Sequence, residues 1–360
     1  GFNPDQRFVR YHTQATHPTK PTPPTMIYPW HQTPWQQLTR DIARLPHAVL
    51  IAGPAGGGKG QLAQTLAQRL LCERAVDHQL PCGECDACRW WLAGNHPDMR
   101  LVAPGQDDEA GDEDKPTARS STIRIEQIRA LMEFLSVGAV RGGRRVVLIN
   151  PAEAMNLATA NALLKLLEEP PPKTQFILVS HEPGKLLPTI RSRTQVWSIP
   201  EPSRAQSEAW LLGEGVREAA RWLDFAGGMP LAAQKAAEQG EDVARFLRDI
   251  ESLPRSDAVM LAAQWEAWVK PRAGGQMSLV VLSEWLQKWL FDLILVKATG
   301  SPRFFSSRRE ALREIAQRAS FAALWGCYNA LTQMRRAANH PLNPRLFLDD
   351  MLLRYTRIAA

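Results

Sequence analysis

One stretch decides the fold of this 360-residue chain: Gly53-Pro54-Ala55-Gly56-Gly57-Gly58-Lys59-Gly60. It contains the pattern G-x-x-x-x-G-K, in which glycines let backbone N–H groups turn toward a phosphate and the lysine reaches the terminal phosphates. A short apolar run over 48–52 precedes it, and a leucine pattern with helical spacing follows it over 61–71. Strand, loop and helix in this order predict a P-loop, with Gly53, Gly58 and Lys59 as the nucleotide-binding residues.

The same alternation continues downstream of this loop. Residues 145–149 and 176–180 are mostly apolar, rich in Val and Ile, and short enough to be buried strands. Between them, residues 158–169 place leucines on one helical face. Strands that alternate with helices predict an α/β domain built on a parallel sheet covered by helices on both faces.

Two features that nucleotide hydrolysis requires are missing. The position after Lys59 should carry a Ser or Thr hydroxyl for Mg²⁺, and it is Gly60. The strand at 145–149 should end in acidic residues that hold the metal, and Asn150-Pro151 follows it. Hydrolysis is therefore expected to be close to absent, and ATP binding weak or absent. The residues leave open whether the loop still holds a nucleotide or is only a structural turn.

Four of the five cysteines lie in one short segment: Cys72, Cys82, Cys85 and Cys88. Clustered cysteines in a long chain indicate a metal site more than a disulfide framework. Four sulfur ligands fit a closed, structural Zn²⁺ site, the zinc knuckle, which leaves no open position for catalysis. An iron–sulfur cluster would accept the same ligands, but no other residue pattern indicates redox chemistry. We expect Cys327 to be a buried core residue and His96 to pack locally.

The rest of the composition is that of a soluble protein. No apolar run reaches the roughly 18 residues that a membrane span needs, so no membrane partner is expected and the expected location is cytoplasmic. Residues 1–25 are predicted to be a flexible extension or leader, and the acidic stretch at 104–122 a disordered loop. Beyond residue 200 helical patterns dominate, and Asn343-Pro344 predicts the start of the last helix. The net charge of +6 lies mainly in residues 243–360, and fits either a solvated surface or a face for nucleic acid or an acidic partner.

Two further segments carry a resemblance to a known family. Asn161-Ala162-Leu163-Leu164-Lys165-Leu166-Leu167-Glu168-Glu169-Pro170-Pro171 is similar to the N-A-L-L-K-x-L-E-E-P-P signature of bacterial clamp-loader AAA+ subunits. Thr189-Ile190-Arg191-Ser192-Arg193-Thr194 resembles the S-R-C element of that family, with Thr194 in place of Cys. The four-cysteine insertion after the P-loop helix is also typical of these subunits. The resemblance covers residues 26–360.

The departures from the family pattern resemble the delta-prime type of DNA polymerase III subunit. Gamma/tau subunits keep the Ser/Thr and the acidic pair, and a family arginine expected near Gly227-Gly228-Met229 is replaced here by Pro230. Arg193 of the S-R element is intact. The resemblance implies that Arg193 is an arginine finger, acting in trans on ATP held by a neighbouring gamma/tau subunit; Arg191 is the other candidate for this role.

The resemblance also implies the division of the chain and its partners. Residues 26–197 would form the AAA+ P-loop domain with its zinc-binding insertion, 198–242 a small helical lid, and 243–360 an all-α collar for oligomerisation. The implied partners are gamma/tau and delta subunits, the sliding clamp, and primed DNA. Two alternatives stay open: an active ATPase motor of the same family, and a zinc-dependent nucleic-acid-binding module.

Overall fold

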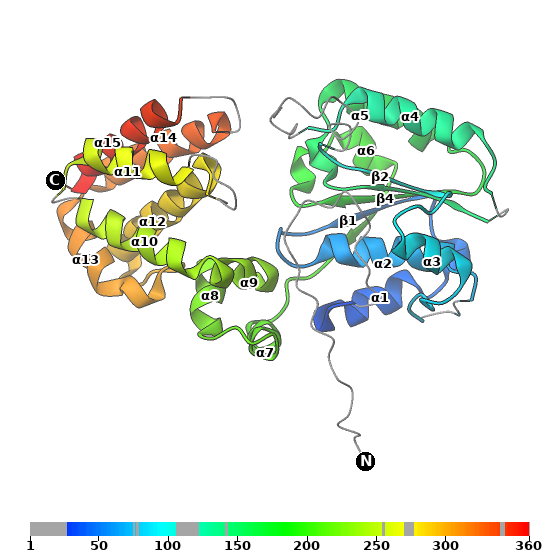
Figure 1. The fold of residues 1–360 in the computed structure, drawn as a ribbon, viewed down its shortest axis with the longest axis horizontal. Helices are drawn as coiled ribbons and strands as arrows, with labels where there is room; N and C mark the ends of the chain where they lie inside the picture. The colour runs from blue at the N-terminus through cyan, green and yellow to red at the C-terminus, as the bar shows by residue number, and fades with distance from the viewer. Residues whose placement is uncertain are drawn as a thin grey trace, which may run out of the picture. The chain divides into compact units, whose positions relative to one another are not determined.

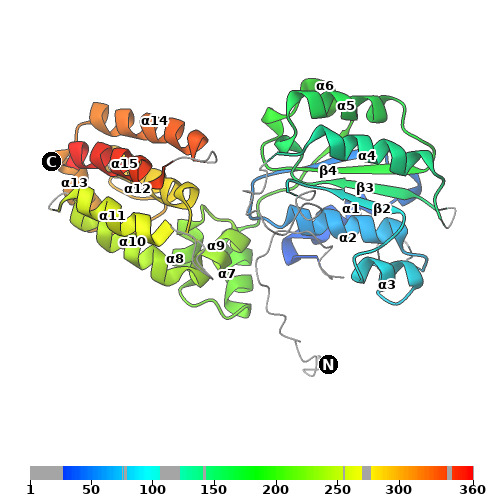
Figure 2. The ribbon, with the colours of Figure 1, turned by 45° about the horizontal axis from the view of Figure 1, so that its top comes forward.

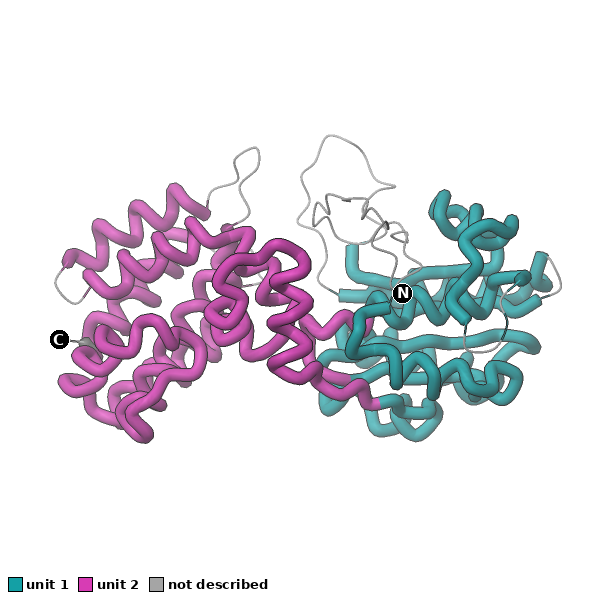
Figure 3. The backbone as a smooth tube through the Cα atoms, turned by 90° about the horizontal axis from the view of Figure 1, so that it is seen from below, with its two compact units in different colours: residues 1–52, 60–197 teal, residues 53–59, 198–360 magenta. Residues whose placement is uncertain are grey.

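The computed structural model describes residues 27–74, 76, 79–105, 122–140, 143–253, 256–269, 277–338 and 343–359. The chain forms two compact units, one of residues 1–52 and 60–197 and the other of residues 53–59 and 198–360 (Figure 3). The extension predicted at 1–25 and nearly all of the acidic loop predicted at 104–122 lie outside the described residues. The predicted division into an AAA+ domain, a lid and a collar stays a prediction.

The first unit contains one five-stranded sheet in the order β2-β3-β4-β1-β5 (Figure 1). Its strands are β1 (Ala48–Ala52), β2 (Met99–Val102), β3 (Arg145–Ile149), β4 (Thr174–Ser180) and β5 (Gln195–Ser198). β1 pairs with β4, β4 with β3, and β3 with β2, all in parallel. The three predicted strands are confirmed. The sequence missed β2 and β5, which are four residues long and lack a continuous apolar run.

Every residue of β1, β3 and β4 is buried because helices cover both faces of the sheet. α4 (Ile125–Ser136) and α5 (Leu157–Glu168) lie on one side, and α2 (Lys59–Leu71) lies on the other (Figures 1 and 2). Alternate strand residues pack on α4 and α5: Leu50, Val147 and Phe176 share one buried cluster with Leu163. This is the α/β architecture that the sequence predicted. Three short helices complete the unit: α1 (Gln32–Leu38), α3 (Asp86–Leu92) and α6 (Pro188–Ser192).

The second unit is helical apart from the loop at 53–59. Its helices are α7 (Arg204–Gly213), α8 (Ala219–Phe225), α9 (Pro230–Glu238), α10 (Gly240–Ser252), α11 (Ala258–Val269), α12 (Leu279–Thr299), α13 (Arg309–Arg318), α14 (Phe321–Ala337) and α15 (Pro344–Ala359). One buried apolar cluster runs through it from Leu211 to Ile358. None of the helices in the described ranges has the length and the apolar character that crossing a membrane requires.

The predicted start of the last helix is confirmed. α15 begins at Pro344, and the side-chain oxygen of Asn343 accepts the N–H of Arg345 at 2.9 Å. Its apolar face is fully buried, including Leu348 and Tyr355. The Tyr355 hydroxyl accepts a hydrogen bond from the indole Nε1 of Trp289 at 2.9 Å, so the buried phenol has a partner.

A buried carboxylate fixes the connection between α12 and α13. Asp292 is fully buried, and its two oxygens accept the N–H groups of Arg303, Phe304 and Phe305 at 2.8, 2.9 and 2.7 Å. Burial raises the pKa of Asp292, and the three N–H donors act in the opposite direction. The ring of Phe305 in turn contacts that of Phe225 in α8, with 5.5 Å between centroids. Asp292 therefore holds the loop that joins the early helices of this unit to the later ones.

We predict that Asp292→Ala lowers the free energy of unfolding by about 2–4 kcal/mol, because three backbone N–H groups lose their acceptor. Asp350→Ala is the control, since Asp350 is an exposed acid paired with Arg354 at 2.7 Å, and its loss should cost about 1 kcal/mol or less. Urea unfolding followed by far-UV circular dichroism measures both. Equal losses in the two variants would contradict the assigned role.

Candidate functional site

The phosphate loop packs closely against the start of α9. Gly56 has φ +82°, and a Cβ built on it would lie 3.0 Å from the Cβ atoms of Met229 and Ala232. The N–H of Leu231 donates to the Gly56 carbonyl oxygen at 3.1 Å. The positive φ of Gly56 favours glycine, and a Cβ there would press tightly against Met229 and Ala232.

The lysine of the loop is turned back onto the loop itself. Lys59 is only 3% exposed, and its Nζ donates to the carbonyl oxygen of Pro54 at 2.5 Å. The cavity beside it is lined by Pro54, Lys59, Pro200 and Met229, among others, and has a volume of about 10 Å³. That volume holds about one water molecule.

The position after Lys59 lies close to the residue that follows β3. A Cβ at Gly60 would lie 3.1 Å from the side-chain Nδ2 of Asn150. A side chain at position 60 would therefore contact the amide of Asn150 closely. Glu153 is the nearest acid in the sequence after β3. One of its two carboxylate oxygens, Oε1, already accepts the N–H of His181 at 2.8 Å.

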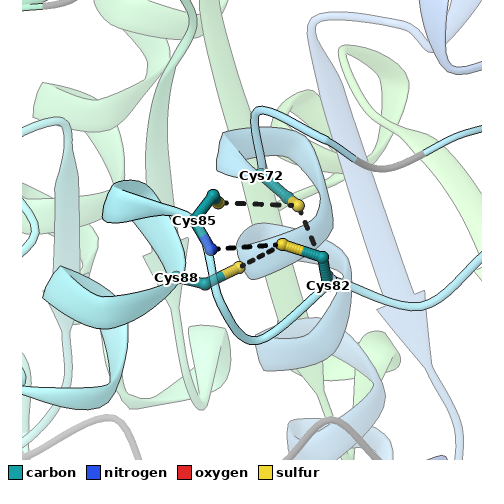
Figure 4. Close-up of side chains that lie close together, drawn as sticks. All are labelled: Cys72, Cys82, Cys85 and Cys88. Carbon is teal, nitrogen blue, oxygen red and sulfur yellow. Dashed lines mark hydrogen bonds between the residues drawn. The ribbon is translucent and has the colours of Figure 1, made fainter.

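The four clustered cysteines meet in space, as the sequence predicted (Figure 4). Cys72 follows the end of α2, Cys82 lies in the loop, and Cys85 and Cys88 lie at the start of α3. The four Sγ atoms lie within 4.8 Å of one another, with 3.9 Å between Cys72 and Cys85 and 4.0 Å between Cys82 and Cys88. Four sulfurs at about 2.3 Å from one tetrahedral ion would be about 3.8 Å apart, so the cluster fits such an ion.

Backbone N–H groups stabilise the thiolate form in this cluster. The N–H of Cys82 donates to Cys72 Sγ, and the N–H of Cys85 to Cys82 Sγ, both at 3.4 Å. Burial acts to raise the pKa of Cys82, but the N–H groups of Glu84 and Cys85 outweigh it and lower that pKa to about 6. Burial raises the pKa of Cys72 and of Cys88. A bound cation would favour the deprotonated form of all four thiols.

His96 and Cys327, which the sequence did not assign to the metal cluster, have other surroundings in the structure. His96 is buried; its ring packs edge-on against Trp90, and its Nδ1 accepts the N–H of Asp98 at 3.1 Å. Cys327 is buried in the apolar cluster of the second unit. Both predictions, local packing for His96 and a core position for Cys327, are confirmed.

The arginine of the S-R element follows α6 directly and is partly exposed. The Arg193 side chain is 35% exposed, and its Nη2 lies 2.6 Å from Oε1 of Glu168, the last residue of α5. Its Nη1 donates to the carbonyl oxygen of Thr189 at 3.2 Å and to the hydroxyl of Ser192 at 3.4 Å. The guanidinium thus has three partners at the surface of the first unit.

The neighbours of Arg193 in the sequence behave differently. Arg191 is exposed, and its guanidinium has no hydrogen bond or ion pair with any residue that the structure describes. Thr194, which replaces the family cysteine, is buried and donates its hydroxyl hydrogen toward the carbonyl oxygens of Ile190 and Arg191, at 3.2 and 3.3 Å. The threonine therefore satisfies its polar group within its own turn.

Comparison with known proteins places this arrangement in a family. A model described as "DNA polymerase III, delta subunit" matches residues 30–203, and one described as "DNA polymerase III, delta subunit, C terminal" matches residues 241–357. The DNA polymerase III subunit delta-prime of Pseudomonas aeruginosa is 35% identical over 344 residues, 92% of this chain and 98% of that protein. The chain belongs to the DNA polymerase III delta-prime family. As a delta-prime family member, it has the AAA+ fold expected from its sequence.

Two more distant relatives complete the comparison. The gamma/tau subunit of Mycobacterium bovis is 36% identical over 164 residues, which cover 46% of this chain and 26% of that protein. The solved structure of a DNA polymerase III gamma subunit-related protein from Thermotoga maritima aligns with 91% of this chain and 99% of its own, at 16% identity and a TM-score of 0.46.

Two contacts of the site were not found from the sequence. Glu168 lies within the segment that resembles the family signature, but the sequence does not show which of the two adjacent glutamates faces Arg193. The sequence also does not indicate the contact between Gly56 and the start of α9. Contacts between segments more than 20 residues apart leave no local pattern in the sequence from which they could be predicted.

We predict that the purified protein carries one tightly bound Zn²⁺ per chain and that Cys82→Ser or Cys85→Ser lowers this content to a small fraction. A structural site with four sulfur ligands contributes to folding directly, so these variants should also unfold at lower temperature. Cys327→Ala is the matched control and should keep the metal. Elemental analysis of the purified variants measures the content; equal zinc in all three would contradict the assignment.

Proposed function

We propose that this chain is a non-hydrolysing AAA+ subunit of the replicative clamp loader that donates Arg193 to a neighbour's ATP site. The observation that carries the proposal is a contrast within one chain. Gly60 and Asn150 offer magnesium neither a hydroxyl nor a carboxylate, and Lys59 is hydrogen-bonded within the loop, while the arginine of the S-R element is present and partly exposed. A subunit of this kind acts on its neighbours' nucleotide and not on its own.

The geometry of the loop supports the absence of hydrolysis. Phosphoryl transfer depends on a metal ion that neutralises charge on the β- and γ-phosphates. Gly60 and Asn150 offer that ion neither a hydroxyl nor a carboxylate, and they approach each other closely. The hydrogen bonds of Lys59 and Gly56 within the loop and to α9 would have to break before a triphosphate could enter. We infer that ATP binding is weak or absent.

The arginine role rests on electrostatics. A guanidinium placed at the γ-phosphate of a neighbour's ATP stabilises the charge that develops in the transition state, which is worth about 10³-fold or more in rate. Arg193 is permanently charged and partly exposed, and it comes from the signature element of the family. Arg191 is the other candidate, and its side chain has no partner among the described residues that would fix its direction.

The metal site has a structural role in this proposal. The four sulfurs leave no open position on a tetrahedral ion, so bound Zn²⁺ would tie the end of α2 to the start of α3 and carry out no chemistry.

The partners follow from the family. We infer assembly with gamma/tau and delta subunits into a complex that loads the sliding clamp onto primed DNA. The helices of residues 243–360 would supply the oligomerisation surface, and their basic side chains would help binding to DNA. The complex would act in the cytoplasm, where the chromosome is replicated.

Two other functions fit the observations less well. An active motor of the same family needs magnesium ligands that Gly60 and Asn150 do not provide. A zinc-dependent nucleic-acid-binding module would need a broad surface of basic and aromatic side chains on the knuckle. In α3, Arg89 is exposed and Trp90 partly exposed, but Trp91 is fully buried, so the helix presents one residue of each kind.

We predict that Arg193→Ala lowers the DNA-stimulated ATPase of the assembled loader by about 10-fold or more in kcat, since the stabilisation of transition-state charge is lost at one interface. Arg191→Ala should leave the rate within about two-fold. Size-exclusion chromatography confirms that both variants still assemble. If the Arg193 variant hydrolyses ATP at the normal rate, or if only the Arg191 variant loses activity, the assignment is wrong.

A further inference from the structure

A carboxylate lies directly beside the arginine to which the function is assigned. Oε1 of Glu168 and Nη2 of Arg193 are 2.6 Å apart, and the two side chains are 48% and 35% exposed. Glu168 is the last residue of α5, and Arg193 follows α6, so the contact joins two helices that pack against each other. The two residues are 25 positions apart in the sequence, and the pair depends on the tertiary fold.

The guanidinium has further partners that fix its plane. Nη1 donates to the Thr189 carbonyl oxygen and the Ser192 hydroxyl, whereas the carboxylate contact is made by Nη2. An arginine carries five N–H donors, so these contacts leave others available for the oxygens of a phosphate. The side chain is therefore oriented and still able to bind.

We propose that Glu168 is a positioning residue that orients Arg193 toward the γ-phosphate of a neighbouring subunit's ATP. This inference rests on the role proposed for Arg193. A free arginine side chain samples many rotamers, and ordering it at the interface opposes its contribution to the transition state. Contacts made before assembly reduce that entropic cost, which is how preorganised groups accelerate a reaction.

The expected size of the effect is small and measurable. The ion pair is more than one-third exposed and screened by water and salt, so it contributes little on its own. We expect Glu168→Gln to lower kcat of the assembled loader by about two- to five-fold, the range for exposed ion pairs. KM for ATP should stay unchanged, because the nucleotide is bound by the neighbouring subunit and only the transition state is affected.

The neighbouring glutamate provides a matched control. Glu169 is exposed and adjacent in the sequence, and it forms no ion pair with any residue that the structure describes. Glu169→Gln removes the same charge from the same turn, so it should leave kcat unchanged. Glu168→Asp keeps the charge on a shorter side chain and should restore part of the rate lost in Glu168→Gln.

A double-mutant cycle in the assembled loader tests whether Glu168 acts through Arg193. DNA-stimulated ATPase is measured for Glu168→Gln, Arg193→Ala, the double variant and Glu169→Gln, with thermal unfolding of each purified chain. We expect the effect of Glu168→Gln to disappear when Arg193 is already alanine. The same loss in both backgrounds would show that Glu168 acts elsewhere and would overturn the inference.

The outcomes separate this inference from the proposed function. If Arg193→Ala lowers kcat and Glu168→Gln behaves like Glu169→Gln, the arginine role stands and the positioning role is wrong. A rate above the unmodified level in Glu168→Gln would mean that the carboxylate restrains the arginine, and would likewise overturn the inference. If Arg193→Ala has no effect, the proposed function fails, and the inference fails with it.

Discussion

The contact between the phosphate loop and the start of α9 constrains most of what the chain can do. The Gly56 carbonyl oxygen accepts the N–H of Leu231, and a side chain at Gly56 would press tightly against Met229 and Ala232. The loop therefore forms one compact unit with the helices that follow residue 197, although β1 and α2, its neighbours in the sequence, lie almost wholly in the other unit. A segment that in a motor would hold a nucleotide is here part of the packing, and this favours a role that does not depend on the chain's own ATP.

The remaining chemistry is concentrated in the first unit, on elements that the sheet holds rigidly. α5 and α6 carry Glu168 and Arg193 and contact each other beside the buried strands. The cysteine cluster brings four sulfur atoms from the end of α2, the following loop and the start of α3 within 4.8 Å of one another. In the proposed function these two features have separate tasks: one stabilises charge in a neighbouring subunit, and the other holds the domain together. Neither requires the loop to bind a phosphate.

The sequence predicted the features that local patterns encode. The buried strand Arg145–Ile149 is mostly apolar, the four cysteines share one segment, and Asn343-Pro344 marks a helix start by its own side-chain chemistry. It missed β5, a short edge strand whose residues are mostly exposed and therefore carry no apolar run. It also missed the Glu168–Arg193 pair and the closure of α9 on Gly56, because both depend on how distant segments pack.

The most direct test of a non-motor subunit is the steady-state ATPase of the purified chain with Mg²⁺ and primed DNA, measured against Lys59→Ala. Lys59 is the residue on which any turnover in this loop would depend. A chain with Gly60 and Asn150 in place of magnesium ligands should show no turnover that the substitution removes. Clear turnover in the unmodified chain that disappears in Lys59→Ala would mean that the subunit is a motor and that its loop opens to bind ATP.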